Sequence, residues 1–404
     1  MTLDIATAMR KMAEAHGPGE CDDADCSLCV PGKDIAFQLK NTDRVVVFTT
    51  IATAGSPQDG ATEAMLDIET RDALFARPGF PKPLTRLLVP TYRIGPAGEK
   101  GLGMFATRRL RTGALIVNER PFIVQPICRA ACDACDHMSC RTIPAEQVGY
   151  TMEEREENLN LSLNRMPEER WERFLELKTS HSEHRAGSGP LLSRARTNAW
   201  HALGEYKFAG IDAQDGQYLA IFDELSRMNH SCRPNALYHW DSSTFSGSLR
   251  AVRDIEPGEE ITVSYCGEVD RPYSDRRALL APYGFGCDCR ACAEGDAADI
   301  RYEQIIAEYD DLPFPLSSDK RVEQGYRYAI QRIEEEGLEA IDQYYSSHVH
   351  LTRYYRWTRD VAKAQVCEEK LNAISWAQRG KPFEPAKYEG VWPMLDGSIL
   401  YHMK

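Results

Sequence analysis

Three short segments hold the residues of this chain whose types and spacing indicate chemistry. Residues 229–235 read Asn-His-Ser-Cys-Arg-Pro-Asn, residues 258–265 end a β-branched run on a tyrosine, and residues 287–292 space three cysteines as Cys-x-Cys-x-x-Cys. The first segment offers an amide, an imidazole and a thiol, the second a phenol, and the third a set of metal ligands. All three lie between Arg227 and Cys292, an arrangement that chance rarely produces.

The cysteines of the third segment predict a zinc site. Cys287, Cys289 and Cys292 do not easily complete a tetrahedron by themselves, so a structural zinc needs a fourth ligand from elsewhere in the chain. Cys232 is the natural candidate because it lies inside the first segment. Such a site would tie residue 232 to residues 287–292 and add folding free energy. The alternative is a set of structural or free cysteines.

Strands, turns and helices must position these residues. β-Branched and apolar runs predict strands over residues 44–50, 92–94, 114–117, 249–253 and 261–265. Two turns are expected, a glycine-rich one over residues 101–106 and a tight one over residues 256–259. Apolar residues at helical spacing predict helices that begin at Pro167 and that fill residues 297–380. A short N-terminal helix and a proline-rich linker over residues 78–90 complete the pattern.

Composition narrows the class of protein. The chain has 404 residues, 43% of them hydrophobic and 27% charged, which predicts two or three globular domains. It contains no run of 18 apolar residues and no apolar N-terminal segment, so we expect no membrane span, no secretory signal and an intracellular location. The net charge of -13 argues against direct nucleic-acid binding, which needs a basic face. It fits a Lys- or Arg-rich protein partner, or ordinary solubility alone.

Thirteen cysteines is a high and odd number for an intracellular chain, and most of them are clustered. Tight clusters in a reducing compartment favour metal ligands over disulfides. One further cluster, a possible second zinc site, consists of Cys128, Cys132, Cys135 and Cys140. Another consists of Cys21, Cys26 and Cys29. Free cysteines in loops are the alternative for both clusters.

Together the motifs resemble those of SET-domain protein-lysine methyltransferases. The family's Asn-His-Ser-Cys-x-Pro-Asn motif is matched at residues 229–235, and its Gly-Glu-Glu-Ile-x-x-x-Tyr strand at residues 258–265. Its post-SET cysteines are matched at residues 287–292, and its Gly-x-Gly turn at Gly101 and Gly103. Order and spacing most resemble the split-SET branch, the SET-and-MYND-like proteins, and especially their fungal relatives. The resemblance covers roughly residues 92–292.

The resemblance implies an α+β fold. Its SET core would consist of short, mostly antiparallel strands, with a helical insertion and a helical C-terminal domain. We expect an N-terminal extension (1–90), a first SET part (91–127), an inserted segment (128–200), the SET core (201–280), the post-SET zinc segment (281–296) and the helical domain (297–404). Relatives carry a longer MYND zinc finger where the 128–140 cluster lies, and that cluster departs from the MYND pattern.

The resemblance also implies a cofactor and a reaction. Family members transfer the methyl group of S-adenosylmethionine to a lysine amine of a protein. Tyr265 matches the catalytic tyrosine, Tyr283 would line the lysine channel, and Phe285 would stack on the adenine. Asn229 and His230 match residues that hold the cofactor. For Tyr265 the alternative is a core tyrosine at the end of a strand, and for Asn229 and His230 it is a polar turn. For Tyr283 and Phe285 it is an apolar plug that holds the zinc segment.

Two further contacts with the cofactor are implied by the resemblance. A backbone cradle is expected from the residues around the Gly-x-Gly turn, namely Lys100, Gly101, Leu102, Gly103 and Met104. Asn198 resembles a cofactor-contacting asparagine of the branch. A plain hairpin turn and a helix cap are the respective alternatives.

Protein-lysine methylation is therefore the leading functional hypothesis, with zinc and S-adenosylmethionine as the implied cofactors and a lysine-containing protein as the partner. Two other hypotheses remain open at this stage. A SET module without catalytic activity would bind a protein partner, and a SET-fold enzyme would act on a small molecule. The substrate's identity, the degree of methylation and the oligomeric state are not encoded in readable motifs.

Overall fold

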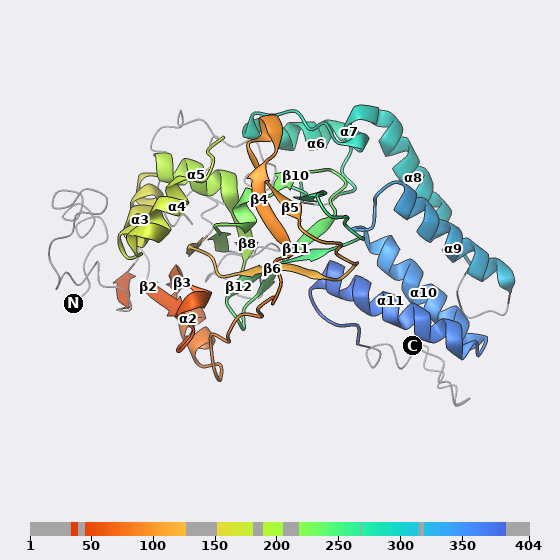
Figure 1. The fold of residues 1–404 in the computed structure, drawn as a ribbon, viewed down its shortest axis with the longest axis horizontal. Helices are drawn as coiled ribbons and strands as arrows, with labels where there is room; N and C mark the ends of the chain where they lie inside the picture. The colour runs from red at the N-terminus through yellow and green to blue at the C-terminus, as the bar shows by residue number, and fades with distance from the viewer. Residues whose placement is uncertain are drawn as a thin grey trace. The chain divides into compact units, whose positions relative to one another are not determined.

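The computed structural model describes residues 34–38, 45–126, 152–180, 189–204, 218–267, 269–313, 315 and 319–384. These residues form two compact units, each assembled from several stretches of the chain (Figure 1). The first unit takes in described residues up to 86, then 118–227 and 240–247. The second takes in residues 87–117, 228–239 and those from 248 onward.

The first unit is built on a six-stranded sheet of order β1-β2-β3-β7-β9-β8. Its strands are Ile35–Gln38 (β1), Val45–Ala52 (β2), Ala61–Asp67 (β3), Ile123–Pro126 (β7), Ala199–Ala202 (β8) and Tyr218–Ile221 (β9). The pair β3–β7 is parallel, and the other neighbours are antiparallel. The β-branched run of β2 is buried along nearly its whole length, as expected of a strand inside a sheet that is covered on both faces.

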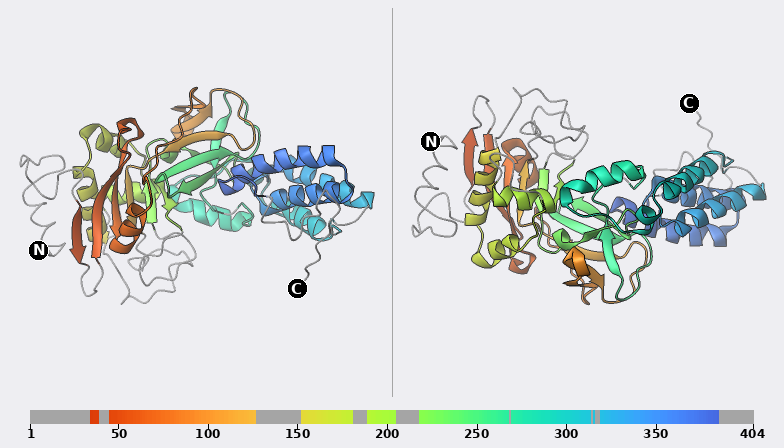
Figure 2. Two further views of the ribbon diagram at one scale, coloured as in Figure 1. Left: turned by 90° about the horizontal axis from the view of Figure 1, so that it is seen from below. Right: turned by 90° about the horizontal axis from the view of Figure 1, so that it is seen from above.

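Helices pack against this sheet within the first unit (Figure 2). They are Ile68–Phe75 (α2), Met152–Asn164 (α3), Glu168–Leu175 (α4) and Pro190–Asn198 (α5). Ile123, the first residue of β7, and Phe122 before it share a buried cluster with Leu159 of α3, Phe174 of α4 and Leu192 of α5. This cluster fixes the helices that follow β7 against the sheet.

A buried ion pair also ties these helices to the sheet. Arg165, which follows α3, donates from Nε to Glu63 Oε2 of β3 at 2.6 Å, and neither side chain is more than 3% exposed. Burial raises the pKa of Glu63, against the opposing effect of Arg165. Loss of either partner would leave an uncompensated charge in the core.

The second unit contains a four-stranded sheet of order β10-β13-β5-β4. The strands are Tyr92–Pro96 (β4), Leu102–Ala106 (β5), Asn229–His230 (β10) and Glu260–Val263 (β13). The β10–β13 pair is parallel and the others are antiparallel. A three-stranded sheet has the order β11-β12-β6, with strands Leu115–Glu119 (β6), Ala236–Asp241 (β11) and Ser246–Ala251 (β12). The boundaries between the two units fall within these three strands.

Helices make up the rest of the second unit. They are Tyr273–Leu280 (α6), Arg290–Glu294 (α7), Asp296–Asp310 (α8), Lys320–Glu335 (α9), Asp342–Trp357 (α10) and Val361–Arg379 (α11). Ile333, Tyr344 and Leu371 share a buried cluster that joins α9, α10 and α11. Gly380 ends α11 in the left-handed conformation, with a φ of 64°, which glycine adopts readily. Short 3₁₀ helices are Pro57–Asp59 (η1), Gly98–Lys100 (η2), Leu225–Arg227 (η5) and Ala281–Tyr283 (η6).

These elements confirm the expected α+β architecture with a helical C-terminal region. The predicted turn over residues 101–106 was wrong: the turn ends at Gly101, and the next five residues form β5, because they pair with both β4 and β13. Pro167 lies one residue before α4 rather than at its first position. Strands β1, β2 and β3, from the predicted N-terminal extension, share a sheet with β7, β8 and β9.

Some sequence predictions fall outside the described residues. They concern the short N-terminal helix and the two further cysteine clusters, at residues 21–29 and 128–140. Within the described part of the chain, no helix is both long and apolar enough to cross a membrane.

Candidate cofactor and metal site

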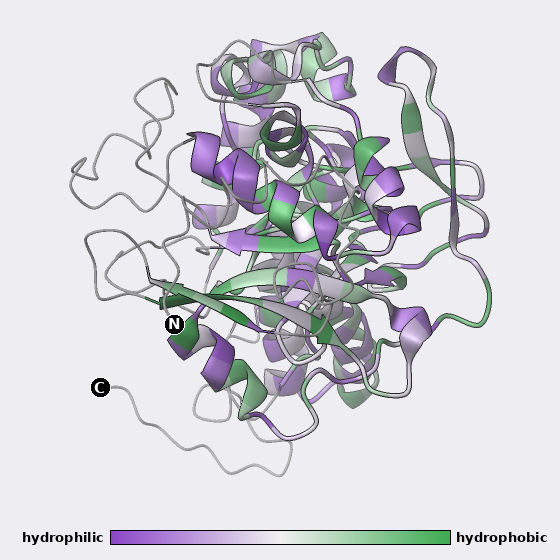
Figure 3. Ribbon diagram, turned by 90° about the vertical axis from the view of Figure 1, so that its left-hand side faces the viewer, coloured by the Kyte–Doolittle hydropathy of each residue, from purple (hydrophilic) through white to green (hydrophobic). Residues whose placement is uncertain are grey.

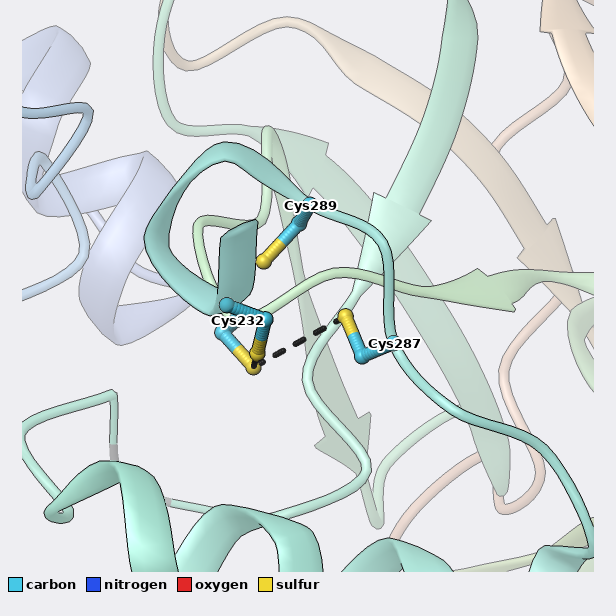
Figure 4. Close-up of side chains that lie close together, drawn as sticks. Cys232, Cys287 and Cys289 are labelled. Carbon is cyan, nitrogen blue, oxygen red and sulfur yellow. Dashed lines mark hydrogen bonds between the residues drawn. The ribbon is translucent and has the colours of Figure 1, made fainter. Parts of the chain in front are cut away.

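Four cysteines converge in the second unit, as the sequence predicts. Cys232 follows β10, Cys287 and Cys289 precede α7, and Cys292 lies within α7 (Figure 4). Their four Sγ atoms all lie within 4.8 Å of one another. The Sγ atom of Cys232 is 3.4 Å from that of Cys292 and 3.9 Å from that of Cys287. A tetrahedron of zinc–sulfur bonds of about 2.3 Å requires sulfur–sulfur distances of about 3.8 Å, so the cluster fits a zinc ion.

The thiols of the cluster shift one another's pKa values. Hydrogen bonds from Cys232 and Cys287 lower the pKa of Cys289, whereas hydrogen bonds with Cys266, Cys287 and Cys289 raise the pKa of Cys232. Cys289 is thus favoured as a thiolate, while Cys232 is favoured as a protonated thiol. Four thiolates at these distances require a positive charge among them, which a divalent metal supplies. Among the described residues no other His, Cys or carboxylate group of this kind occurs.

His230 connects the cysteines to Tyr265. Its Nδ1 accepts a hydrogen bond from the backbone N–H of Tyr265 at 2.9 Å, and its Nε2 lies 3.2 Å from Cys232 Sγ. Burial lowers the pKa of His230 to about 4, so the ring is neutral at pH 7. With Nδ1 accepting, Nε2 carries the proton and donates to the sulfur. This is the kind of partner that orients a metal ligand.

Asn229 lies beside the Gly-x-Gly segment. Its Nδ2 donates to Glu260 Oε1 at 2.7 Å and to the carbonyl oxygen of Leu102 at 3.0 Å. A Cβ atom on Gly103 would lie 2.6 Å from Glu260 Oε1 and 3.0 Å from Asn229 Nδ2, so a larger residue there would displace these side chains. Gly101 has a φ of 85°, which also favours glycine. Asn229 is held in place because β10 pairs with β13, the strand that carries Glu260.

Three aromatic rings gather next to Asn229 and His230. The ring centroid of Tyr265 lies 5.0 Å from that of Tyr283 and 6.4 Å from that of Phe285, and the ring of His230 is 5.3 Å from Tyr265. The hydroxyl of Tyr265 donates to the backbone oxygen of Met228. Burial, with smaller effects of Tyr283 and Glu260, raises the pKa of Tyr265, so its hydroxyl stays protonated. The rings form an apolar wall with one fixed hydroxyl.

An exposed ion pair joins the Gly-x-Gly segment to the cysteine segment. Lys100, at the end of η2, places Nζ 3.0 Å from Asp288 Oδ1, between two of the metal-ligand candidates. Although partial burial opposes it, the hydrogen bond to Asp288 raises the pKa of Lys100. Lys100, Leu102 and Met104 thus border the same region as Asn229, and Met104 is fully buried.

Not all predicted site residues belong to the described part of the second unit. Asn198 lies at the end of α5 in the first unit, where its Nδ2 donates to the backbone oxygens of Lys178 at 2.7 Å and of Arg194 at 2.8 Å. Its contact with a cofactor stays a prediction. The possible second zinc ligands Cys128, Cys132, Cys135 and Cys140 lie outside the described residues, as do Cys21, Cys26 and Cys29.

Sequence reasoning missed three residues of this region. Glu260 holds the Asn229 amide, Asp288 pairs with Lys100, and Cys266 forms a hydrogen bond with Cys232 while its Sγ lies 3.8 Å from the backbone oxygen of Arg276. Glu260 and Cys266 belong to or follow the Gly-Glu-Glu strand motif. Their positions in the motif can be read from the sequence, but the residues that they contact are known only from the structure.

Part of the chain matches a known family of protein domains. Residues 101–266 match the family model described as the SET domain, and these residues include Gly103, Asn229, His230 and Tyr265. The matched residues include parts of both units. The helices and short strands of the structure agree with the α+β fold expected from the motifs.

The relatives are named as lysine methyltransferases. The chain is similar to "Histone-lysine N-methyltransferase set5" of Schizosaccharomyces pombe, with 30% identity over 225 residues, 54% of this chain and 57% of that protein. It is 36% identical over 120 residues to "N-lysine methyltransferase SMYD2" of Homo sapiens, 29% of this chain and 25% of that protein. The matches thus span at most 57% of these relatives' own length.

Solved structures add only a weak likeness. One, titled "ctPRC2 in an autoinhibited conformation bound to S-adenosylmethionine", has a TM-score of 0.23 and 14% identity and covers 73% of this chain and 31% of that chain. A likeness at this level carries no argument about function.

Proposed function

We propose that this chain transfers the methyl group of S-adenosylmethionine to lysine side chains of protein substrates. The observation that carries the proposal is the gathering of Gly103, Asn229, His230 and Tyr265 in one unit, within residues that match the SET domain. The names of the relatives support the same activity. We further propose that the chain belongs to the split-SET, fungal-type branch, that the cysteine segment is its post-SET motif, and that the protein acts in the cytoplasm or nucleus.

S-Adenosylmethionine would supply an electrophilic methyl group on a sulfonium. We propose that Asn229, His230 and the backbone of Lys100, Gly101, Leu102, Gly103 and Met104 hold this cofactor. Phe285, which is 37% exposed, would cover its adenine. Asn198 is proposed as an additional contact. Gly101 and Gly103 have no side chain, so the backbone at these positions can approach a ligand closely.

Tyr265 and Tyr283 are proposed as the catalytic residues. A lysine amine must be neutral and in line with the methyl group before displacement can occur. The hydroxyl of Tyr265 is oriented by its bond to Met228 and its pKa is raised, so it is suited to positioning the amine and not to accepting its proton. Tyr283, whose ring packs against that of Tyr265 at an interplanar angle of 37°, would complete an aromatic channel that excludes water and favours a methylated ammonium.

The metal proposed for Cys232, Cys287, Cys289 and Cys292 is zinc, in a structural role. Their closed set of four sulfurs leaves no position for a substrate or water. His230 donates to Cys232 and accepts from Tyr265, so the metal-ordered segment would hold both the cofactor turn and the catalytic tyrosine. The zinc would therefore act on the reaction only through positioning.

The proposal is tested by separating cofactor binding from transfer. Tyr265→Phe should reduce the transfer of labelled methyl groups to protein by tenfold or more, or change the methylation degree, while S-adenosylmethionine binds with nearly unchanged affinity. Tyr328→Phe, an exposed tyrosine on α9, is the matched control. Unchanged transfer and product pattern in Tyr265→Phe would overturn the proposed role.

A further inference from the structure

The helices between β7 and β8 hold a pocket that the proposed methyl transfer does not use. This insert pocket has a volume of about 400 Å³ and lies between α3, α4 and α5 of the first unit. Its lining combines the large apolar side chains of Leu163, Trp171, Leu175 and Leu191 with Pro190 and four polar residues, Glu156, Glu157, Asn160 and Asn164. Its size is in the range that receives a small ligand or one or two large side chains.

The floor of the insert pocket continues the core of the first unit. Leu163 is buried in the same cluster as Phe174 and Leu192, and the half-buried side chains of Trp171 and Leu175 pack against this cluster. Trp171 and Leu175 are four residues apart on α4 and therefore share a face. An apolar side chain entering here would extend an existing core, and aromatic residues in such places commonly carry the energy of an interface.

The rim of the insert pocket is acidic. Both carboxylate oxygens of Glu156 are fixed, since they accept hydrogen bonds from the backbone N–H groups of Leu191 at 2.9 Å and Leu192 at 2.6 Å. Glu157, also in the lining, is exposed. The same two helices, α3 and α4, expose Glu153, Glu168, Glu169 and Glu172, whereas Glu176, which follows α4, pairs with Arg227.

Three basic residues of α4 and of the segment before it are engaged by other groups, whereas Arg194 of α5 donates to the backbone oxygens of Leu175 and Pro190 in the pocket lining. Arg165 pairs with Glu63, Arg173 with Asp223, and Arg170 lies over the ring of Phe122 at 5.0 Å from its centroid. Figure 3 faces the side of the molecule that carries α3 and α4 and shows hydrophilic and hydrophobic residues within single helices. Exposed glutamates of α3 and α4 therefore make the surroundings of the apolar pocket mainly acidic, with Arg194 as a cation beside it.

We infer that the insert pocket docks a protein segment rich in lysine and arginine through one large apolar side chain. The apolar anchor would fill the space beside Trp171 and Leu175, and the flanking cations would pair with Glu157 and the exposed glutamates. Pairing of opposite charges at a rim speeds association and selects the partner, while the buried anchor supplies most of the affinity. An acidic segment would be repelled, and a basic segment without an anchor would bind weakly. This inference does not depend on methyl transfer.

Three fluorescein-labelled peptides test the partner's chemistry against the full chain by fluorescence anisotropy. The first has one phenylalanine flanked by lysines and arginines, the second has alanine at the anchor, and the third has glutamates in place of the basic residues. We expect saturable binding of the first, a loss of about tenfold or more for the second, and no binding of the third. Equal binding of the first two peptides, or binding of the third, would overturn the inference.

Two charge variants locate the site on the protein. Glu157→Lys should weaken binding of the first peptide by about threefold to tenfold. Glu303→Lys makes the same charge change at an exposed position of α8 and should leave binding unchanged. Equal effects of the two variants would show that only net charge matters and would refute the docking site. Trp171→Ala should lower affinity by about tenfold or more; if it does not fold, the peptide series and the charge pair still decide.

Discussion

Gly103 is the position where the proposed cofactor site leaves the least room. A Cβ atom there would lie 2.6 Å from Glu260 Oε1 and 3.0 Å from both Asn229 Nδ2 and Ala97 Cβ. Real Cβ atoms do not tolerate such contacts, so Gly103→Ala must displace β5, Glu260 or Asn229. We therefore expect the variant to fold and to bind S-adenosylmethionine poorly.

The size of the effect follows from the contact that is displaced. Asn229 Nδ2 donates to the Glu260 carboxylate at 2.7 Å, and a hydrogen bond to a charged group contributes about 1.5–3 kcal/mol. If the cofactor requires this orientation of Asn229, its affinity falls by about ten- to hundredfold. Overpacking should also lower the free energy of unfolding by about 1–3 kcal/mol. Titration calorimetry with S-adenosylmethionine and urea unfolding measure the two effects.

Gly258→Ala separates the two effects. Gly258 has a φ of 85°, and no atom would lie within 4 Å of its added Cβ, so alanine there strains the backbone without a clash. We expect a loss of about 1–2 kcal/mol in stability with no change in cofactor affinity. The reasoning fails if Gly103→Ala binds the cofactor like the unmodified chain, or if Gly258→Ala weakens binding equally.

Three further predictions concern the metal and pH. Removal of the metal, by chelation or by Cys292→Ser, should lower both the melting temperature and the affinity for S-adenosylmethionine. The two effects are coupled because His230 joins Cys232 to Tyr265 through hydrogen bonds. An unchanged cofactor affinity after metal loss would contradict this coupling. The rate of methyl transfer should rise with pH through the range where lysine amines lose their proton. It should not decline near pH 10, because the pKa of Tyr265 is raised and its hydroxyl stays protonated there. A decline near pH 10 that Tyr265→Phe abolishes would contradict this. Burial raises the pKa of Glu339 from 4.5 to about 7. The free energy of unfolding should therefore fall by up to about 3 kcal/mol as the pH rises from 4.5 to 7, and then level off. Urea titrations test this, and an unchanged pH dependence in Glu339→Gln would refute it.

The sequence allowed prediction of those parts of the site that lie within contiguous motifs. Cys232 was assigned to the cysteine cluster because it lies inside the first motif. Tyr265, Tyr283 and Phe285 were expected to lie together because of the resemblance to SET-domain proteins. The side-chain role of His230 was not predicted, since its ring joins two atoms whose proximity depends on the parallel pairing of β10 with β13. Spacing alone does not show which strands become neighbours.

Elements defined by long-range pairing were the hardest to predict. The residues after Gly101 have glycine-rich composition, which favours a turn, yet pairing on both sides makes them a strand. Tertiary contacts thus decided this case against the local pattern.

The most direct test of the central claim is to incubate the zinc-loaded chain with methyl-labelled S-adenosylmethionine and a cell lysate, and to count the protein and small-molecule fractions separately. We predict label in the protein fraction, recovered after hydrolysis as methylated lysine, and its loss with Asn229→Ala. Cofactor binding without any transfer, or label confined to the small-molecule fraction, would contradict the account.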